Sequence, residues 1–346
     1  MDDISQNELL EIINDAGKRG ATDVHLSPDA PVMIRLNGEL VMPDERILSA
    51  QVIESFFTQD PDGGRDLLLE RGSTLFSYVT EEGGRYRVNL FETVKGYCAA
   101  MHYIPESVMS MTELMMPQAV CALSKKKSGL IIFSGTKGSG KTTCAASFAD
   151  GINETEKRVI VTLGRVCEYV LAPKNSVIIQ RETGDRPENM ERAIRDASLQ
   201  DADVIFADGS SDRLETEACI DAALNGQLVI TTLEAAGVIE SIKKIIKSAD
   251  EYKREYIRDR LASALVCICS LCTVYGPQGE RVMVNEIMTA DRAIRNLIKE
   301  EKYNQILSLM QADKSGKMMT FGKHVSELVS KGVISGEIPE NLIDIP

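Results

Sequence analysis

The stretch Gly135-Thr136-Lys137-Gly138-Ser139-Gly140-Lys141-Thr142 decides the fold. It fits the pattern G-x-x-x-x-G-K-[ST] in full. The apolar run LIIF at residues 130–133 predicts a buried strand before it, and residues 142–149 favour a helix after it. The alternative is a glycine turn that only joins a strand to a helix. Because motif and context are both present, the stretch predicts a phosphate-binding loop.

Each residue type in this loop has a chemical reason. Glycines let backbone N–H groups wrap around phosphate oxygens, and the helix N-terminus adds a partial positive charge. Lys141 is expected to reach the β- and γ-phosphates, and Thr142 to offer its hydroxyl to Mg²⁺. The loop therefore predicts a nucleotide and Mg²⁺ as cofactors, and because it reads phosphates rather than the base, ATP as the nucleotide is implied only by the family resemblance given below. The predicted phosphate-binding residues are Gly135, Thr136, Lys137, Gly138, Ser139, Gly140, Lys141, Thr142 and Thr143.

Around this loop, predicted strands and helices alternate along the chain. The predicted strands cover residues 129–134, 159–163, 204–207 and 228–232, and the predicted helices cover 190–198, 215–224 and 239–247. Such alternation predicts a mostly parallel sheet covered on both faces. A helical tail is expected from Asp291.

The first hundred residues have a different pattern. A helix is predicted over residues 3–19, and Asn37-Gly38 marks a hairpin between strands near 32–36 and 39–41. Further strands are expected at 75–79 and 86–91. This part reads as a small α+β domain. We therefore predict an α/β protein with an N-terminal domain at 1–104, a linker at 105–117 and a P-loop domain with a helical C-terminal region at 118–346.

Composition limits the compartment and the partners. The chain has 346 residues and a net charge of −13, which argues against nonspecific binding to nucleic acid or anionic lipid. It has neither a signal-peptide pattern nor an apolar stretch of the ~20 residues that a membrane span needs. A cytoplasmic protein is expected. Cys269-x-x-Cys272 could be half of a zinc site, but its apolar flanks favour buried thiols.

Several further segments resemble the PilT-type retraction ATPases of type IV pili, within the type II/IV secretion ATPase superfamily. They are ATDVHLS at 21–27, MIRLNGEL at 33–40, GRYRVNLF at 84–91, QRE at 180–182 and AIRNLI at 293–298. The last resembles a C-terminal motif typical of the retraction branch. The resemblance covers nearly the whole chain.

The resemblance implies a PAS-like N-terminal domain and a RecA-like ATPase core, assembled as a hexameric ring that powers pilus retraction and twitching motility. It implies a homo-hexamer, or a hetero-hexamer with an intact paralogue. It also implies a pilus platform protein of the inner membrane as partner, with the chain at the inner face of that membrane. Basic residues of the N-terminal domain, here Arg85 and Arg87, would neutralise phosphate charge. The alternative for both arginines is a solvated strand face.

Several positions depart from the family pattern. Gly164 and Arg165 stand where the family has a catalytic glutamate and an aspartate, so only Glu168 of that acidic box survives. In the Walker B region Gly209 falls on the glutamate position and Asp208 precedes it. Asp208 could hold the Mg²⁺ shell, or Asp208-Gly209 could be a simple turn.

Both histidines of the family's histidine box are also replaced, by Gln227 and Glu234. Glu234 could act as a relocated base or be a solvated loop carboxylate. Where the family usually has arginine, His102 precedes Ile104-Pro105, which should weaken transition-state stabilisation. The phosphate loop meanwhile matches in full.

The predicted catalytic residues are therefore Asp208, Glu234 and Glu168, and the predicted Mg²⁺ site is Thr142 with Asp208. Each missing catalytic group would cost roughly 10²- to 10⁴-fold in rate. Two functions remain open from the sequence. One is a retraction-type ATP-driven motor with reduced hydrolysis. The other is a non-hydrolysing ATP-binding accessory or regulatory subunit that works with an intact paralogous ATPase. A nucleotide sensor without a pilus role is disfavoured by residues 293–298.

Overall fold

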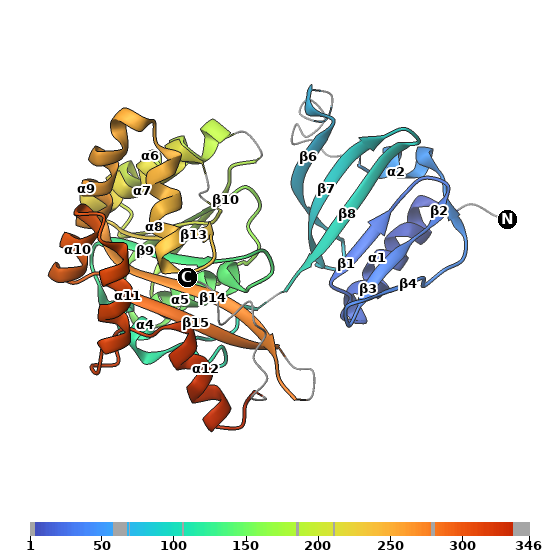
Figure 1. Ribbon diagram of the computed structural model, residues 1–346. Coiled ribbons are helices and arrows are strands. Elements are labelled where there is room, and N and C mark those ends of the chain that lie inside the picture. The colour runs from blue at the N-terminus through green and yellow to red at the C-terminus, as the bar shows by residue number, and fades with distance from the viewer. Residues whose placement is uncertain are drawn as a thin grey trace. The chain divides into compact units, whose positions relative to one another are not determined.

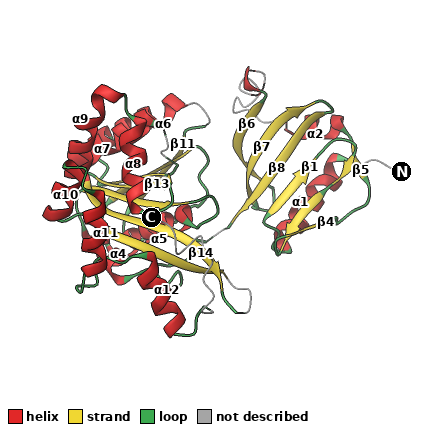
Figure 2. Cartoon of the chain, in the orientation of Figure 1, coloured by secondary structure: helices red, strands yellow, loops and turns green. Residues whose placement is uncertain are grey.

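The protein is described from a computed structural model that covers residues 4–57, 68, 70–105, 107–184, 187–209, 212–277 and 281–334. The chain divides into two compact units (Figures 1 and 2). The first comprises Met1–Ser107 with Arg165–Val170 and Glu182–Asp185, and the second comprises the rest of the chain.

The first unit contains an antiparallel sheet, and two of its helices, both within the described residues, pack against that sheet. Its helices are α1 (Gln6–Lys18) and α2 (Ala50–Phe57). Its strands are β1 (Asp23–Leu26), β2 (Ala30–Pro31), β3 (Met33–Leu36), β4 (Glu39–Val41), β5 (Ile47–Leu48), β6 (Ser73–Val79), β7 (Arg85–Thr93) and β8 (Gly96–Ile104). Six of the strands form a sheet in the order β4-β3-β1-β8-β7-β6.

Local sequence explains why these elements form. A capping box starts α1, because the Ser5 and Glu8 side chains satisfy each other's backbone N–H groups. Asn37 and Gly38 both have positive φ, as the two-residue hairpin between β3 and β4 requires. Leu9 and Ile13 of α1 are fully buried in the same cluster as Val88 of β7. The predicted α+β character of this part is confirmed.

The second unit is built around a seven-stranded sheet. Its strands are β9 (Gly129–Gly135), β10 (Val159–Gly164), β11 (Val177–Glu182), β12 (Val204–Ala207), β13 (Leu228–Glu234), β14 (Leu265–Tyr275) and β15 (Arg281–Thr289). Their order in the sheet is β11-β10-β12-β13-β9-β14-β15. The five strands from β10 to β14 in that order are parallel, and β15 is antiparallel to β14.

Within the described residues, helices alternate with the parallel strands of this unit, as the pattern predicts, and continue in a C-terminal helical tail. They are α4 (Gln118–Cys121), α5 (Lys141–Thr155), α6 (Pro187–Leu199), α7 (Arg213–Leu224), α8 (Val238–Ser248), α9 (Arg254–Ala264), α10 (Arg292–Lys299), α11 (Tyr303–Ala312) and α12 (Phe321–Ser330). Two 3₁₀ turns, η1 (Ala122–Lys125) and η2 (Glu251–Lys253), complete the unit.

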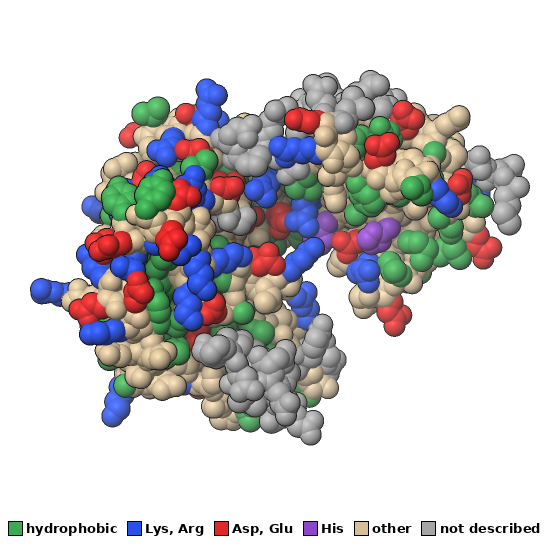
Figure 3. All heavy atoms as spheres, turned by 45° about the horizontal axis from the view of Figure 1, so that its top comes forward, with side chains coloured by type: hydrophobic (Ala, Val, Ile, Leu, Met, Phe, Trp, Pro, Cys, Tyr) green, Lys and Arg blue, Asp and Glu red, His purple; other side chains and the backbone are tan. Residues whose placement is uncertain are grey.

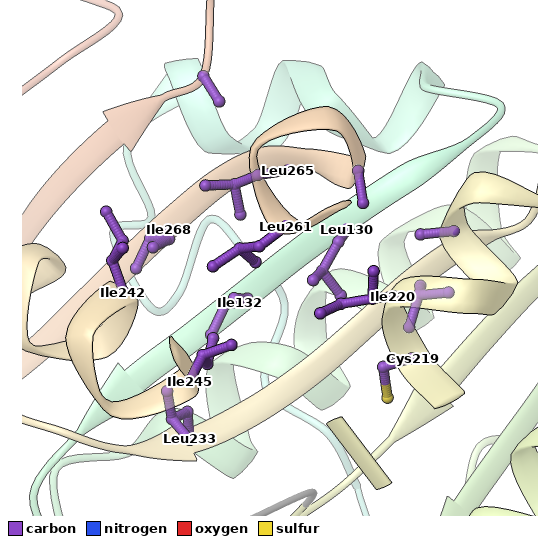
Figure 4. Packing of buried hydrophobic residues seen from close by; sticks show 14 of the residues in the cluster. Leu130, Ile132, Cys219, Ile220, Leu233, Ile242, Ile245, Leu261, Leu265 and Ile268 are labelled. Atoms are coloured by element: carbon purple, nitrogen blue, oxygen red, sulfur yellow. The ribbon is translucent and has the colours of Figure 1, made fainter. Parts of the chain in front are cut away.

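Alternate residues of the interior strand β9 face opposite sides of the sheet. Leu130 and Ile132 join the large core that contains Ile220 of α7 and Ile245 of α8 (Figure 4). Phe133 instead meets Phe148 of α5, with ring centroids 5.8 Å apart. Burial on both faces explains why the strand is a continuous apolar run rather than an alternating one. The predicted α/β class with a mostly parallel sheet is confirmed.

Three features of the fold differ from or extend the sequence prediction. Strands β8 and β11 and the long hairpin β14–β15 were not anticipated from the pattern. Within residues 105–117, Met111 packs so closely against Gly151 of α5 that a Cβ added at Gly151 would lie 2.3 Å from the methionine methyl. No helix in the described part of the chain is both long and apolar enough to cross a bilayer.

Candidate functional site: the phosphate loop and its carboxylate

The loop after β9 has the backbone geometry of a phosphate cradle. Gly138 and Gly140 lie in the left-handed region, with φ of 78° and 88°. Gly140 also stands at the N-cap of α5, and within the described residues no side chain caps that helix. An uncapped helix start of this kind presents backbone N–H groups and a partial positive charge that suit an anion.

Gly135 allows the loop to close tightly. A Cβ added at Gly135 would lie 2.2 Å from Ser139 Oγ and 2.6 Å from the carbonyl oxygen of Leu271. Ser139 is itself only 3% exposed, and its hydroxyl has no hydrogen-bond partner among the described residues. A closed glycine loop, an uncapped helix start and an unsatisfied hydroxyl together fit a bound phosphate group.

Thr142 is brought to a carboxylate from another strand. The Thr142 hydroxyl donates to Asp208 Oδ1 at 3.3 Å, and the Thr232 hydroxyl donates to the same oxygen at 2.6 Å. Thr232 Oγ1 in turn accepts from the backbone N–H of Gly209 at 2.7 Å. The two predicted Mg²⁺ ligands, Thr142 and Asp208, thus come together, although they are 66 positions apart in the chain.

The sheet register explains this meeting. Ala207 at the end of β12 pairs with Thr231 of β13, so the following residues, Asp208 and Thr232, lie side by side. Glu234 of β13 pairs with Gly135 of β9 at the same edge. The polar residues that follow the parallel strands therefore lie together at the carboxyl ends of those strands, where folds of this class bind ligands.

Two cationic side chains donate hydrogen bonds to backbone carbonyl oxygens of the phosphate loop. The Lys141 ammonium donates to the carbonyl oxygen of Thr136 at 3.2 Å. From the tip of the β14–β15 hairpin, Arg281 Nη2 donates to the carbonyl oxygen of Gly138 at 2.6 Å. Sequence analysis missed Arg281 because nothing in the local pattern brings position 281 to position 138.

Glu234 is exposed at the end of β13, and its backbone carbonyl accepts from Lys244 Nζ at 2.5 Å. The loop after it leads into α8, whose first N–H group, that of Val238, donates to Glu286 Oε2 at 2.7 Å. Glu286 is only 7% exposed, and burial raises the pKa of its carboxyl group. A single carboxylate among the mostly apolar residues of β15 is the sequence signal from which Glu286 could have been predicted.

The remaining predicted site residues lie in the first unit. Arg87 forms an ion pair with Glu168, and Arg85 forms one with Glu182. Glu182 also accepts from the Ser77 hydroxyl at 2.7 Å. The structure therefore groups both arginines with carboxylates. The partner of Glu168 is therefore Arg87 of the same unit.

His102 also contacts a carboxylate. Its Nδ1 lies 2.9 Å from Asp23 Oδ1, because β1 and β8 pair these two positions in register. The His102 hydrogen bond holds the pKa of Asp23 near 2, below its usual range.

No disulfide bond joins cysteines within the described part of the chain. Cys269 is buried in β14, and burial raises the pKa of its thiol well above the usual value. Among the described residues, no group of three or more His, Cys, Asp or Glu side chains could hold a metal ion.

A mostly parallel sheet with a G-x-x-x-x-G-K-T loop after an interior strand defines a P-loop protein of the α/β class. The chain belongs to the family of type II/IV secretion system proteins, whose model matches residues 2–337.

Individual relatives are similar over most of their length. The type IV pilus retraction ATPase PilT of Pseudomonas aeruginosa is 31% identical over 345 residues, which cover 96% of this chain and 99% of that protein. A twitching motility protein of Neisseria gonorrhoeae is 30% identical, covering 88% of this chain and 82% of that protein. The crystal structure of the pilus retraction motor PilT with bound ADP superposes with a TM-score of 0.85 at 32% identity, covering 97% of this chain and 96% of that one.

Proposed function

We propose that this chain binds Mg²⁺ and ATP and acts as a subunit of the motor that retracts type IV pili. The observation that carries the proposal is the hydrogen bond between Thr142 and Asp208. It brings a carboxylate to the hydroxyl that faces Mg²⁺ in P-loop proteins. The similarity to PilT of Pseudomonas aeruginosa, to the twitching motility protein of Neisseria gonorrhoeae and to the PilT motor with bound ADP supports the same function.

The residues have distinct roles in this proposal. The N–H groups of the loop and of the first turn of α5 bind the phosphates, and Lys141 exchanges its bond to Thr136 for a phosphate oxygen. Thr142 and Asp208 hold the metal, which when bound neutralises charge on the phosphates. Thr232 orients Asp208 through its 2.6 Å hydrogen bond.

Hydrolysis by this chain is slow in our proposal. Gly164 and Gly209 occupy the two positions where the family has a glutamate, and glycine carries no proton acceptor on its side chain. Glu168, the surviving carboxylate of the acidic box, is engaged by Arg87. Loss of one such group lowers a rate by roughly 10²- to 10⁴-fold, and losses within one unit do not add.

Membership of this family also suggests the assembly in which the chain works. We propose a hexameric ring, formed by this chain alone or with an intact paralogue, that works in the cytoplasm against a pilus platform protein at the inner membrane. The second candidate function is a non-hydrolysing ATP-binding subunit that regulates such a paralogue. It is favoured by the engagement of Glu168 and by the two glycines.

Equilibrium binding of ATP with Mg²⁺ to the purified chain tests the proposal. Lys141→Ala should weaken binding by at least about tenfold, since it removes a charge-assisted hydrogen bond to phosphate. Lys157→Ala, which changes an exposed lysine outside the loop, should leave the affinity unchanged. Equal affinity in wild type and Lys141→Ala would show that the loop does not bind the nucleotide. Deleting the gene in its native host and measuring pilus retraction then separates a retraction role from ATP binding alone.

A further inference from the structure

A polar cleft lies in the second unit, between the end of α9 and α10. Its volume is about 460 Å³. The small residues Ala262, Ser263 and Ala290 line it, which leaves room between the elements. The longer side chains around it are those of Arg292, Arg295 and Lys299.

The three cations share one face of α10. They stand at positions i, i+3 and i+7, whereas Ile294 and Ile298 on the other face are fully buried in the core of the unit. Asp291 is the carboxylate among the residues that line the cleft, and its Oδ1 already caps the helix by accepting from the N–H of Ile294 at 2.9 Å. Positive charge therefore exceeds negative charge in the cleft.

The cations differ in how they are held. Arg295 is fixed by the fold, since its Nε donates to the carbonyl oxygen of Ala290 at 3.1 Å and its Nη2 to that of Leu265 at 3.0 Å. These bonds leave most of its five N–H donors for a ligand. In the described part of the chain, no carboxylate pairs with Arg292 or Lys299, and both are exposed.

The excess of positive charge in the cleft differs from the charge of the surface around it. Among nearby cations, Arg258 of α9 pairs with Glu301, and Lys302, which follows α10 in the chain, pairs with Glu300. On the face that Figure 3 shows, basic and acidic side chains are largely intermixed. The whole chain carries a net charge of −13, so a cleft with excess positive charge stands apart from the average surface.

We infer that this cleft docks an acidic segment of a partner protein. Arg292 and Lys299 are seven positions apart in the helix, which corresponds to roughly 10 Å along the axis. A single phosphate is too small to engage both ends of such a row. An extended segment of about three or four residues has the matching length, and arginine binds carboxylates in bidentate fashion. This inference goes beyond the nucleotide site and does not depend on it.

Fluorescence anisotropy of a fluorescein-labelled hexaglutamate peptide, titrated with the full chain in the absence of nucleotide, tests the inference. The charge reversals Arg292→Glu and Lys299→Glu together should weaken binding by about tenfold or more. The matched reversals Lys125→Glu and Lys127→Glu change two exposed lysines elsewhere and should keep the affinity within about twofold. Exchanging the two cations, Arg292→Lys with Lys299→Arg, should retain most of the binding.

Several outcomes would overturn the inference. No binding by the wild type, or equal losses in the two reversed pairs, would mean that the cleft has no specific role. Displacement of the peptide by inorganic phosphate, but not by chloride at the same ionic strength, would assign the cleft to a small phosphate ligand instead. Thermal unfolding of each variant checks its fold. If the reversals unfold the chain, the neutral pair Arg292→Gln and Lys299→Gln should show the same direction of change.

Discussion

The substitution Asp208→Asn separates the charge of Asp208 from its place in the hydrogen-bond network. An asparagine keeps one carbonyl oxygen that can accept from Thr142 and Thr232, as Asp208 Oδ1 does at 3.3 and 2.6 Å. It removes the negative charge that would attract Mg²⁺. The fold should therefore be preserved while the metal-dependent part of ATP binding is lost.

The size of the effect follows from the place of the carboxylate. Groups that support a metal site typically change metal affinity by about 10- to 100-fold when they are removed, which corresponds to about 1.4 to 2.7 kcal/mol. A fluorescent ATP analogue titrated with Mg²⁺ and again with EDTA measures the difference directly. Asp208→Asn should bind the analogue in EDTA as the wild type does, and should lose most of the gain that Mg²⁺ brings.

Asp203 provides a matched control at the opposite end of the same strand. Its Oδ2 accepts from the backbone N–H of Val159 at 2.9 Å, and Asp203→Asn can keep that bond. This control should respond to Mg²⁺ like the wild type. The assignment of Asp208 to the metal is refuted if Asp208→Asn retains the full Mg²⁺ dependence.

Three further predictions concern groups around the loop. Gly135→Ala places a Cβ 2.2 Å from Ser139 Oγ, so it should lower the free energy of unfolding by about 1–3 kcal/mol in denaturant titrations and weaken ATP binding, whereas Gly322→Ala, with open space around it, should do neither. Arg281→Ala removes the bond to Gly138 and should weaken ATP binding several-fold in the same titration; an unchanged affinity would mean that Arg281 does not order the loop. Glu286→Gln should remove a pH dependence of stability. Burial raises the pKa of Glu286 in the folded state, so protonation of this group stabilises the fold at a pH below its unfolded-state pKa. That stabilisation is lost as the pH rises through the folded-state pKa. Thermal melts between pH 4 and 8 should show the variant gaining on the wild type as pH rises, and parallel curves would contradict this.

Much of the fold was predictable because its signals are local. The alternation of apolar runs with helical periods predicts the parallel core, and Asn37-Gly38 predicts the hairpin that the structure shows with positive φ at both residues. The β14–β15 hairpin escaped prediction. β14 is a buried strand without an alternating pattern, and the segment that joins it to its partner β15 includes residues 278–280, which lie outside the described residues.

The site was only partly predictable, because its contacts depend on register. The motif alone selects Thr142, and the end of an apolar strand suggests Asp208. That these two side chains meet depends on the pairing of β12 with β13 and of β13 with β9, which no local pattern encodes. Arg281 and Glu286 contact the loop and the start of α8 from β15, a strand far along the chain, and so were missed.

The most direct test of the central claim is steady-state ATP hydrolysis by the purified chain, measured beside ATP binding, with Lys141→Ala as the background. The account predicts clear Mg²⁺-dependent binding with turnover below about 0.1 s⁻¹, roughly a hundredfold under a typical enzyme. Turnover of several per second that disappears in Lys141→Ala would contradict the account. It would show that a carboxylate such as Glu234 replaces the glutamates missing at Gly164 and Gly209.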